Sequence, residues 1–87
     1  MKKPLVITMG EPSGIASEIA IKSWINRKKL KLPSFFLLDD FNKIEFINKK
    51  FNLNANLKKI ESPEQVSELF GKYLPILDMK INLNFKL

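Results

Sequence analysis

One stretch near the start of the chain constrains its fold more than any other. Residues 4–9 are mostly apolar, the run breaks at Gly10, and a turn with Pro12 and Gly14 leads into an apolar pattern of helical spacing from Ile15. An apolar run, a tight turn and a helical repeat predict a buried strand, a loop and a helix. In an α/β fold, such a loop lies at the carboxyl end of the first strand, where ligands bind.

The first predicted helix extends to about Asn26. Its expected apolar face includes Trp24, and Glu18 and Lys22 have the i,i+4 spacing of an ion pair. The other residues expected on that face are Ile15, Ala16, Ile19 and Ala20. We expect Trp24 and the phenylalanines of the chain to lie in the core.

The apolar run Phe35–Leu38 has no polar alternation, which is typical of a parallel strand covered on both faces. Asp39 or Asp40 then caps a second predicted helix that ends near Asn52. Its apolar positions recur every three or four residues, at Phe41, Ile44, Ile47 and Phe51. The order strand, helix, strand, helix predicts a parallel sheet with right-handed crossovers.

Leu57–Ile60 is a candidate third strand, although its two lysines weaken that prediction. Residues 62–65 form a helix-start pattern in which Ser62 caps, Pro63 occupies the first turn and Gln65 reaches back, with the helix running through Phe70. Residues 73–77 then form a strand, which Pro75 indicates is an edge or irregular segment.

The last residues alternate strictly between apolar and polar types, which predicts a half-buried strand. The apolar positions are Ile81, Leu83, Phe85 and Leu87. Because this pattern stops without a partner strand, we expect residues 1–87 to be the amino-terminal α/β fragment of a larger domain.

Composition excludes several kinds of site. The 87 residues include neither Cys nor His. The chain therefore has no disulfide, no thiolate nucleophile and none of the commonest metal ligands. We predict no catalytic residue and no metal-binding residue in it.

The net charge of +6 invites a nucleic-acid hypothesis, but all of the basic residues except Arg27 are lysines, and most are scattered. The one cluster, residues 27–31, has no interleaved aromatic residues, and we favour a solvated helix end stabilised by the helix dipole. We expect neither nucleic-acid nor membrane partners. The apolar run after Met1 is too short for a signal peptide, which predicts a cytoplasmic location.

The loop does not match the standard phosphate motifs. Counted from Gly10, the second and third glycines of a dinucleotide fingerprint are replaced by Pro12 and Ile15, and Gly14 is not followed by the lysine of a P-loop. Asp39 lies near the position of a ribose-binding acid, but we favour a helix cap.

The candidate site is the loop itself, which consists of Gly10, Glu11, Pro12, Ser13 and Gly14. In one interpretation, its backbone N–H groups approach an anionic ligand and Glu11 orients a polar group. In the other, it is a structural turn in which Pro12 fixes φ and Gly14 supplies an unusual conformation. The residues alone do not separate the two. Glu11 and Glu18 are not expected to act as a catalytic pair.

Residues 7–15 and 18–22 resemble the amino-terminal signature of the 4-hydroxythreonine-4-phosphate dehydrogenases of vitamin B6 biosynthesis. That signature has Asp or Glu followed by Pro-Ala-Gly-Ile-Gly-Pro-Glu, and the chain agrees at Glu11, Pro12, Gly14, Ile15 and Glu18. It departs at Ser13, Ala16 and Ser17.

The resemblance implies the start of a three-layer, mainly parallel α/β fold like that of isocitrate and isopropylmalate dehydrogenases. It implies a homodimeric enzyme that uses NAD or NADP and a divalent metal to oxidise and decarboxylate 4-phosphooxy-threonine. The resemblance covers about the first quarter of such an enzyme, so we expect the 87 residues alone to be inactive. The alternatives are a small module that binds a phosphorylated metabolite and a basic nucleic-acid-binding protein.

Overall fold

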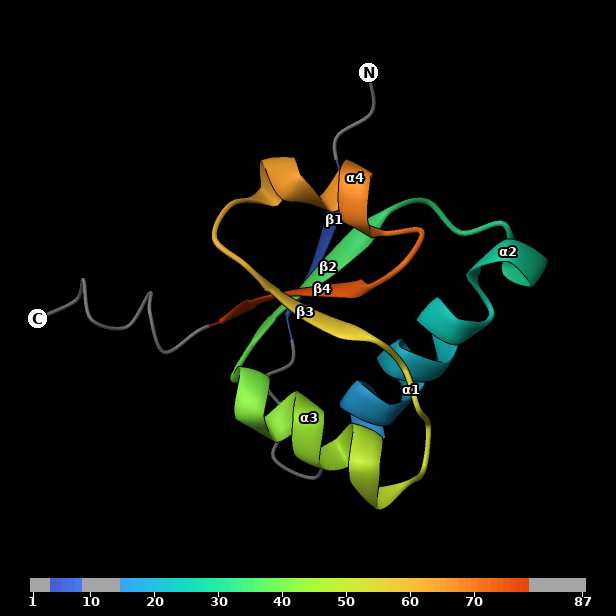
Figure 1. Ribbon diagram of the computed structural model, residues 1–87. Coiled ribbons are helices and arrows are strands. Elements are labelled where there is room, and N and C mark those ends of the chain that lie inside the picture. Colours follow the sequence, from blue (N-terminus) through green and yellow to red (C-terminus); the bar gives the residue numbers. More distant parts are fainter. Residues whose placement is uncertain (1–3, 9–14, 79–87) are drawn as a thin grey trace, which may run out of the picture.

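A computed structural model describes residues 4–8 and 15–78. Its centre is a four-stranded sheet, shown in Figure 1, with every neighbouring pair of strands parallel and the order β1-β2-β4-β3. The strands are β1 (Leu5–Thr8), β2 (Phe35–Asp39), β3 (Leu57–Ile60) and β4 (Leu74–Asp78). The predicted α/β class and the parallel sheet are therefore confirmed.

Helices cover both faces of the sheet. The helices α1 (Ile15–Ile25) and α3 (Phe41–Lys50) pack against each other on one face, whereas α4 (Val66–Leu69) lies on the other (Figure 1). The short helix α2 (Arg27–Leu30) follows α1, and the 3₁₀ turn η1 (Pro63–Gln65) precedes α4. None of the helices in the described residues has the length and apolar character that crossing a bilayer requires.

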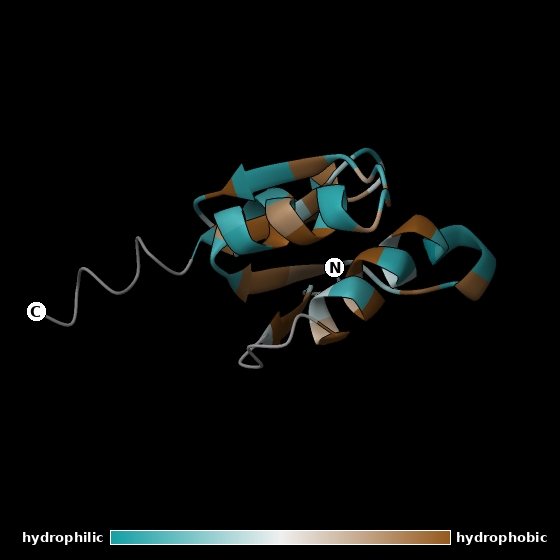
Figure 2. Ribbon diagram, turned by 90° about the horizontal axis from the view of Figure 1, so that it is seen from below, coloured by the Kyte–Doolittle hydropathy of each residue, from teal (hydrophilic) through white to brown (hydrophobic). Residues whose placement is uncertain are grey.

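The core fills both sides of the sheet. On the ribbon coloured by hydropathy, brown and teal alternate along the helices, as expected when each helix buries one stripe (Figure 2). The fully buried residues Leu37, Leu74 and Ile76 form the centre of the sheet, and Ile21 and Ile44 pack over them. This arrangement leaves the ends of the strands, not the sheet faces, as the places where polar groups gather.

The helix starts are capped as the sequence predicts, with one difference. Ser62 and Gln65 form the expected capping box, since Ser62 Oγ accepts from Glu64 N and Gln65 Oε1 accepts from Ser62 N. Asp40, not Asp39, is the N-cap of α3, and its Oδ1 accepts from Asn42 N at 3.0 Å. Of the two predicted caps, Asp39 or Asp40, the structure confirms Asp40, and the cap role favoured for Asp39 is wrong.

Pro75 does not mark an edge strand. β4 lies between β2 and β3, and Pro75 is fully buried. Proline removes at most one ladder donor, and Pro75 stands near the start of its strand, where burial of Leu74 and Ile76 on either side outweighs that loss.

The buried face of α1 also differs from the expected one. Ser17, Ala20, Ile21 and Trp24 face the core, whereas Ile15 and Ile19 are each 59% exposed. The polar residues of this helix, Ser17, Glu18, Lys22 and Ser23, do not all lie on one side, so its sequence contains little information about which stripe turns inward.

Two phenylalanines depart from the expectation of burial. Phe46 and Phe51 of the α3 region are exposed, although Phe35, Phe36 and Phe70 are buried. The side-chain amide of Asn48 holds the connection after α3 in place, because its Nδ2 donates to Ala55 O and its Oδ1 accepts from Ala55 N.

The predicted final strand, residues 81–87, lies outside the described residues.

Candidate site at the carboxyl edge of the sheet

The carboxyl ends of the four strands form one edge of the sheet, and the α1 and α3 crossovers start from it. β1 ends there at Thr8, β2 at Asp39, β3 at Ile60 and β4 at Asp78. The candidate loop, Gly10–Gly14, connects the end of β1 to the start of α1 but lies outside the described residues. The described residues on either side of it, Thr8 and Ile15, lie at this edge. Open parallel sheets bind their ligands outside the carboxyl ends of the strands.

Two buried carboxylates lie side by side at this edge. Asp39 and Asp78 are register partners in the β2–β4 pair, and they are 4% and 6% exposed. Because β4 is inserted next to β2, residues that are far apart in the chain become neighbours. Asp78 is not among the site residues that were predicted from the sequence.

Backbone N–H groups at the amino terminus of α3 donate hydrogen bonds to three carboxylates. These are the carboxylates of Asp39 and Asp78 and that of the cap residue Asp40. Asp39 Oδ1 accepts from Asp40 N at 2.6 Å, and Asp78 Oδ1 is 3.4 Å from Phe41 N. With Asn42 N bound to Asp40, three consecutive amides point at carboxylates. Because the positive end of the helix dipole favours negative charge, the chain's own carboxylates already use this terminus as an anion site.

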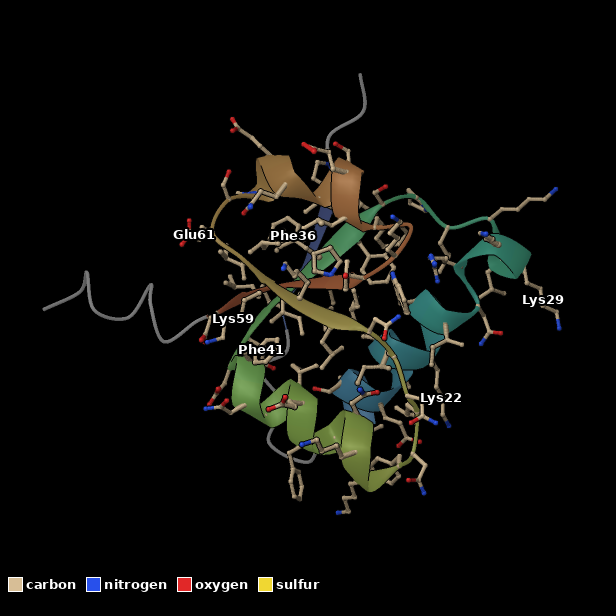
Figure 3. All side chains as sticks on the ribbon, viewed as in Figure 1. Lys22, Lys29, Phe36, Phe41, Lys59 and Glu61 are labelled. Atoms are coloured by element: carbon tan, nitrogen blue, oxygen red, sulfur yellow. The ribbon has the colours of Figure 1, made fainter. Side chains whose placement is uncertain are left out.

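Two lysines balance the negative charges of Asp39 and Asp78. Lys43 Nζ lies 3.1 Å from Asp39 Oδ2, and Lys59 Nζ lies 3.8 Å from Asp78 Oδ2. Figure 3 shows Lys59 beside Phe41, with the ammonium 5.3 Å from the centre of the ring. Asp39 is thus bound at both oxygens, which favours a structural role that fixes the strand end to α3 over the ribose-binding alternative.

The described residues of this edge do not fit a metal site by themselves. The described residues contain no group of three carboxylate, imidazole or thiolate side chains close enough to bind a metal ion. A divalent cation prefers oxygen ligands, but the two carboxylates here are engaged by lysines and helix amides.

The structure also describes the ion pair, the tryptophan and the basic cluster that were predicted for the first helix. Glu18 and Lys22 form the expected ion pair at 2.9 Å, and Trp24 is buried as expected. The basic cluster does not continue α1; it forms the separate helix α2, in which Lys28 and Lys29 are exposed. The prediction that the basic cluster forms the last turn of the first helix is therefore wrong, because α1 ends at Ile25 and the cluster begins a new helix at Arg27.

The fold and this edge define the chain as a parallel α/β structure in which the carboxyl ends of the strands lie together at one edge. Comparison with known proteins identifies relatives of the chain. The chain is 34% identical over 77 residues to a 4-hydroxythreonine-4-phosphate dehydrogenase of Methylorubrum extorquens. That match covers 88% of this chain and 22% of the relative.

Two further relatives have the same name. The enzyme of Zymomonas mobilis is 31% identical over 77 residues, which is 88% of this chain and 22% of that protein. The enzyme of Bradyrhizobium diazoefficiens is 53% identical over 38 residues, which is 44% of this chain and 11% of that protein. No family profile and no solved structure matches the chain.

The resemblance seen in the sequence is confirmed: over most of its length, the chain is a relative of the 4-hydroxythreonine-4-phosphate dehydrogenases, which are oxidoreductases. It spans only about a fifth of the length of these relatives. The likeness to isocitrate and isopropylmalate dehydrogenases stays a prediction.

Proposed function

We propose that the chain forms one wall of the active-site cleft of a 4-hydroxythreonine-4-phosphate dehydrogenase. The supporting observation is the combination of the sequence match with the geometry of the carboxyl edge, where β1 ends at Thr8 and α1 begins at Ile15. In this proposal, the reaction is the NAD- or NADP-dependent oxidation and decarboxylation of 4-phosphooxy-threonine, in the formation of vitamin B6.

The chemistry assigns the reacting groups to the rest of such an enzyme. Oxidising a secondary alcohol requires a base that takes the hydroxyl proton and a Lewis acid that stabilises the developing charge. The chain has no His or Cys, and its buried carboxylates are held by Lys43, Lys59 and the start of α3. We infer that the nicotinamide cofactor and a divalent metal bind mainly to residues of the polypeptide beyond this chain, in a homodimer.

The role of the chain is then to position the substrate. The backbone of Gly10–Gly14 lines the cleft, and Glu11 orients a polar group of the substrate. Asp39 and Asp78 fix the adjoining strand ends to α3, so that the wall is rigid. The phosphate of the substrate is not expected at the amino terminus of α3, because three carboxylates already surround it.

A chimera tests the proposal. In it, the 77 matched residues of the Methylorubrum extorquens enzyme are replaced by the corresponding residues of this chain. We expect metal-dependent NADH or NADPH formation from 4-phosphooxy-threonine, measured by near-ultraviolet absorbance. The isolated chain and the relative without its matched residues are the controls, and both should be inactive. A folded but inactive chimera would count against the proposal.

Glu11→Gln in the chimera separates the two interpretations of the loop. If Glu11 orients substrate, the substitution raises KM or lowers kcat while the melting temperature stays the same. If the loop is only a structural turn, the kinetic constants do not change. Glu64→Gln, at an exposed position of η1, is the matched control.

A further inference from the structure

The two outer strands of the described sheet differ in chemistry. β3 exposes Lys58 and Lys59, and charged residues of this kind protect a sheet edge from pairing with further strands. β1 has no charged residue, and Leu5 and Val6 are 56% and 52% exposed. In the described sheet, β1 has a neighbour on one side only. Its sequence is that of an inner strand, but its position is that of an edge strand.

An apolar groove adjoins this edge. It has a volume of about 420 Å³ and lies between β1, α1 and the connection that leads into β2. Leu5, Ile7, Ile19, Leu32 and Phe35 are among the residues that line it. Ile19 is 59% exposed, and so is Ile15, one turn earlier on the same helix. Edge and groove together form one apolar surface, which we call the β1–α1 surface.

Exposed apolar surfaces of this kind mark places where another element packs. The relatives contain more than three-quarters of their length outside the region that this chain matches, because the match covers 22% of the relative. That part of the family polypeptide is long enough to supply a strand with a covering helix. The lysine-rich β3 edge offers no comparable place for it.

We propose that the β1–α1 surface binds the part of the dehydrogenase polypeptide that lies beyond the matched residues, whether that part is joined to this chain or separate from it. A strand from that part pairs with the edge of β1 that faces away from β2, and an apolar side chain from it fills the groove beside Ile19. This inference rests on the proposed family function, but it concerns assembly and not chemistry.

The test compares two substitutions in two settings. Ile19→Glu places a charge on the β1–α1 surface, whereas Phe46→Glu places one on α3, where the side chain is similarly exposed at 62%. In the isolated chain, both side chains are solvated, so both substitutions should change the melting temperature little. In the chimera, Ile19→Glu should lower it by about 5 °C or more, because a charge is then buried, whereas Phe46→Glu should not.

Hydrogen exchange gives a second measurement that needs no substitution. The amides of residues 5–8 that point away from β2 should exchange rapidly in the isolated chain and slowly in the chimera, because a new strand accepts their hydrogen bonds.

Each other outcome contradicts the proposal. If Ile19→Glu destabilises the isolated chain as strongly as the chimera, the chain itself or a second copy covers the surface. If Ile19→Glu lowers the melting temperature of the chimera no more than Phe46→Glu does, nothing covers the β1–α1 surface. A chimera that does not fold shows that the surface does not fit the rest of the polypeptide.

The two proposals can fail separately. An inactive chimera in which Ile19→Glu has the expected thermal effect contradicts the proposed function alone. An active chimera in which the two substitutions behave alike contradicts the assembly proposal alone.

Discussion

Trp24 Nε1 donates a hydrogen bond to the backbone carbonyl of Phe70 at 3.0 Å, across 46 residues of sequence. Trp24 ends the buried stripe of α1, and Phe70 directly follows α4, so this bond connects two helices that cover opposite faces of the sheet (Figure 1). Phe70 also packs edge to face on Phe35, with the ring centres 5.0 Å apart. The amino-terminal edge of the sheet is therefore fixed by an aromatic cluster, at the opposite end from the candidate site.

Trp24→Phe tests that connection. The substitution keeps an aromatic ring but removes the indole donor, which leaves a buried carbonyl without its partner. We expect a loss of about 1–3 kcal/mol in the free energy of unfolding, measured by urea denaturation. Phe46→Leu is the control, and it should change stability by less than about 0.5 kcal/mol because Phe46 is exposed. Equal effects would contradict the prediction.

Arg27→Lys tests the group that covers the indole. The guanidinium lies 3.9 Å from the centre of the Trp24 ring and donates to the carbonyls of Trp24 and Gly71. Lysine cannot make this planar contact and both hydrogen bonds together, so we expect a loss of about 1 kcal/mol in urea denaturation. Lys28→Arg, on the exposed side of α2, should have almost no effect. A loss at Lys28 as large as at Arg27 would refute this account.

Asp39→Asn tests the carboxylate pair at the carboxyl edge. The amide can still accept from Asp40 N, but it loses the charge that pairs with Lys43. We expect a decrease of about 1–3 kcal/mol in the free energy of unfolding, measured by chemical denaturation.

Asp40→Asn is the matched control for that experiment, because asparagine caps a helix about as well as aspartate does. Its effect should be within about 0.5 kcal/mol. If the two substitutions are equally mild, the ion pair between Asp39 and Lys43 contributes nothing measurable.

Ser17→Ala should stabilise the protein. Within the part of the chain that the structure describes, the Ser17 hydroxyl is buried and has no hydrogen-bond partner. Alanine removes the unsatisfied group and favours the helix, so we expect a gain of up to about 1–2 kcal/mol, seen as a higher melting temperature.

Ser23→Ala, at a half-buried position of the same helix, should give only the smaller gain of helix propensity, about 0.5 kcal/mol. A loss of stability in Ser17→Ala would show that the hydroxyl has a partner after all.

Local sequence patterns predicted the strands and helices well where polar and apolar residues differ. The strand Leu57–Ile60 is confirmed at its predicted bounds, and the capping box at Ser62 is confirmed in detail. These patterns failed where the polar residues do not gather on one side of a helix. In α1, the pattern indicated Ile15 and Ile19 for the core, and the structure buries Ser17 and Ile21 instead.

The candidate site could be predicted only in part. The loop after the first strand was identified from its own residues, and it joins elements that meet at the carboxyl edge. Asp78 was missed, because its importance comes from a neighbour 39 positions earlier in the chain, Asp39, and no local pattern contains that pairing.

The sequence by itself determined the class of fold, the alternation of strands and helices, and the kinship with the dehydrogenases, because these depend on short-range periodicity and on residue identity. Only the tertiary structure decided the strand order, which puts Pro75 in an inner strand, brings Asp39 beside Asp78 and leaves the apolar β1 at an edge. The physical reason is that strand order is chosen by packing between distant segments, whose free energy depends on all of them together.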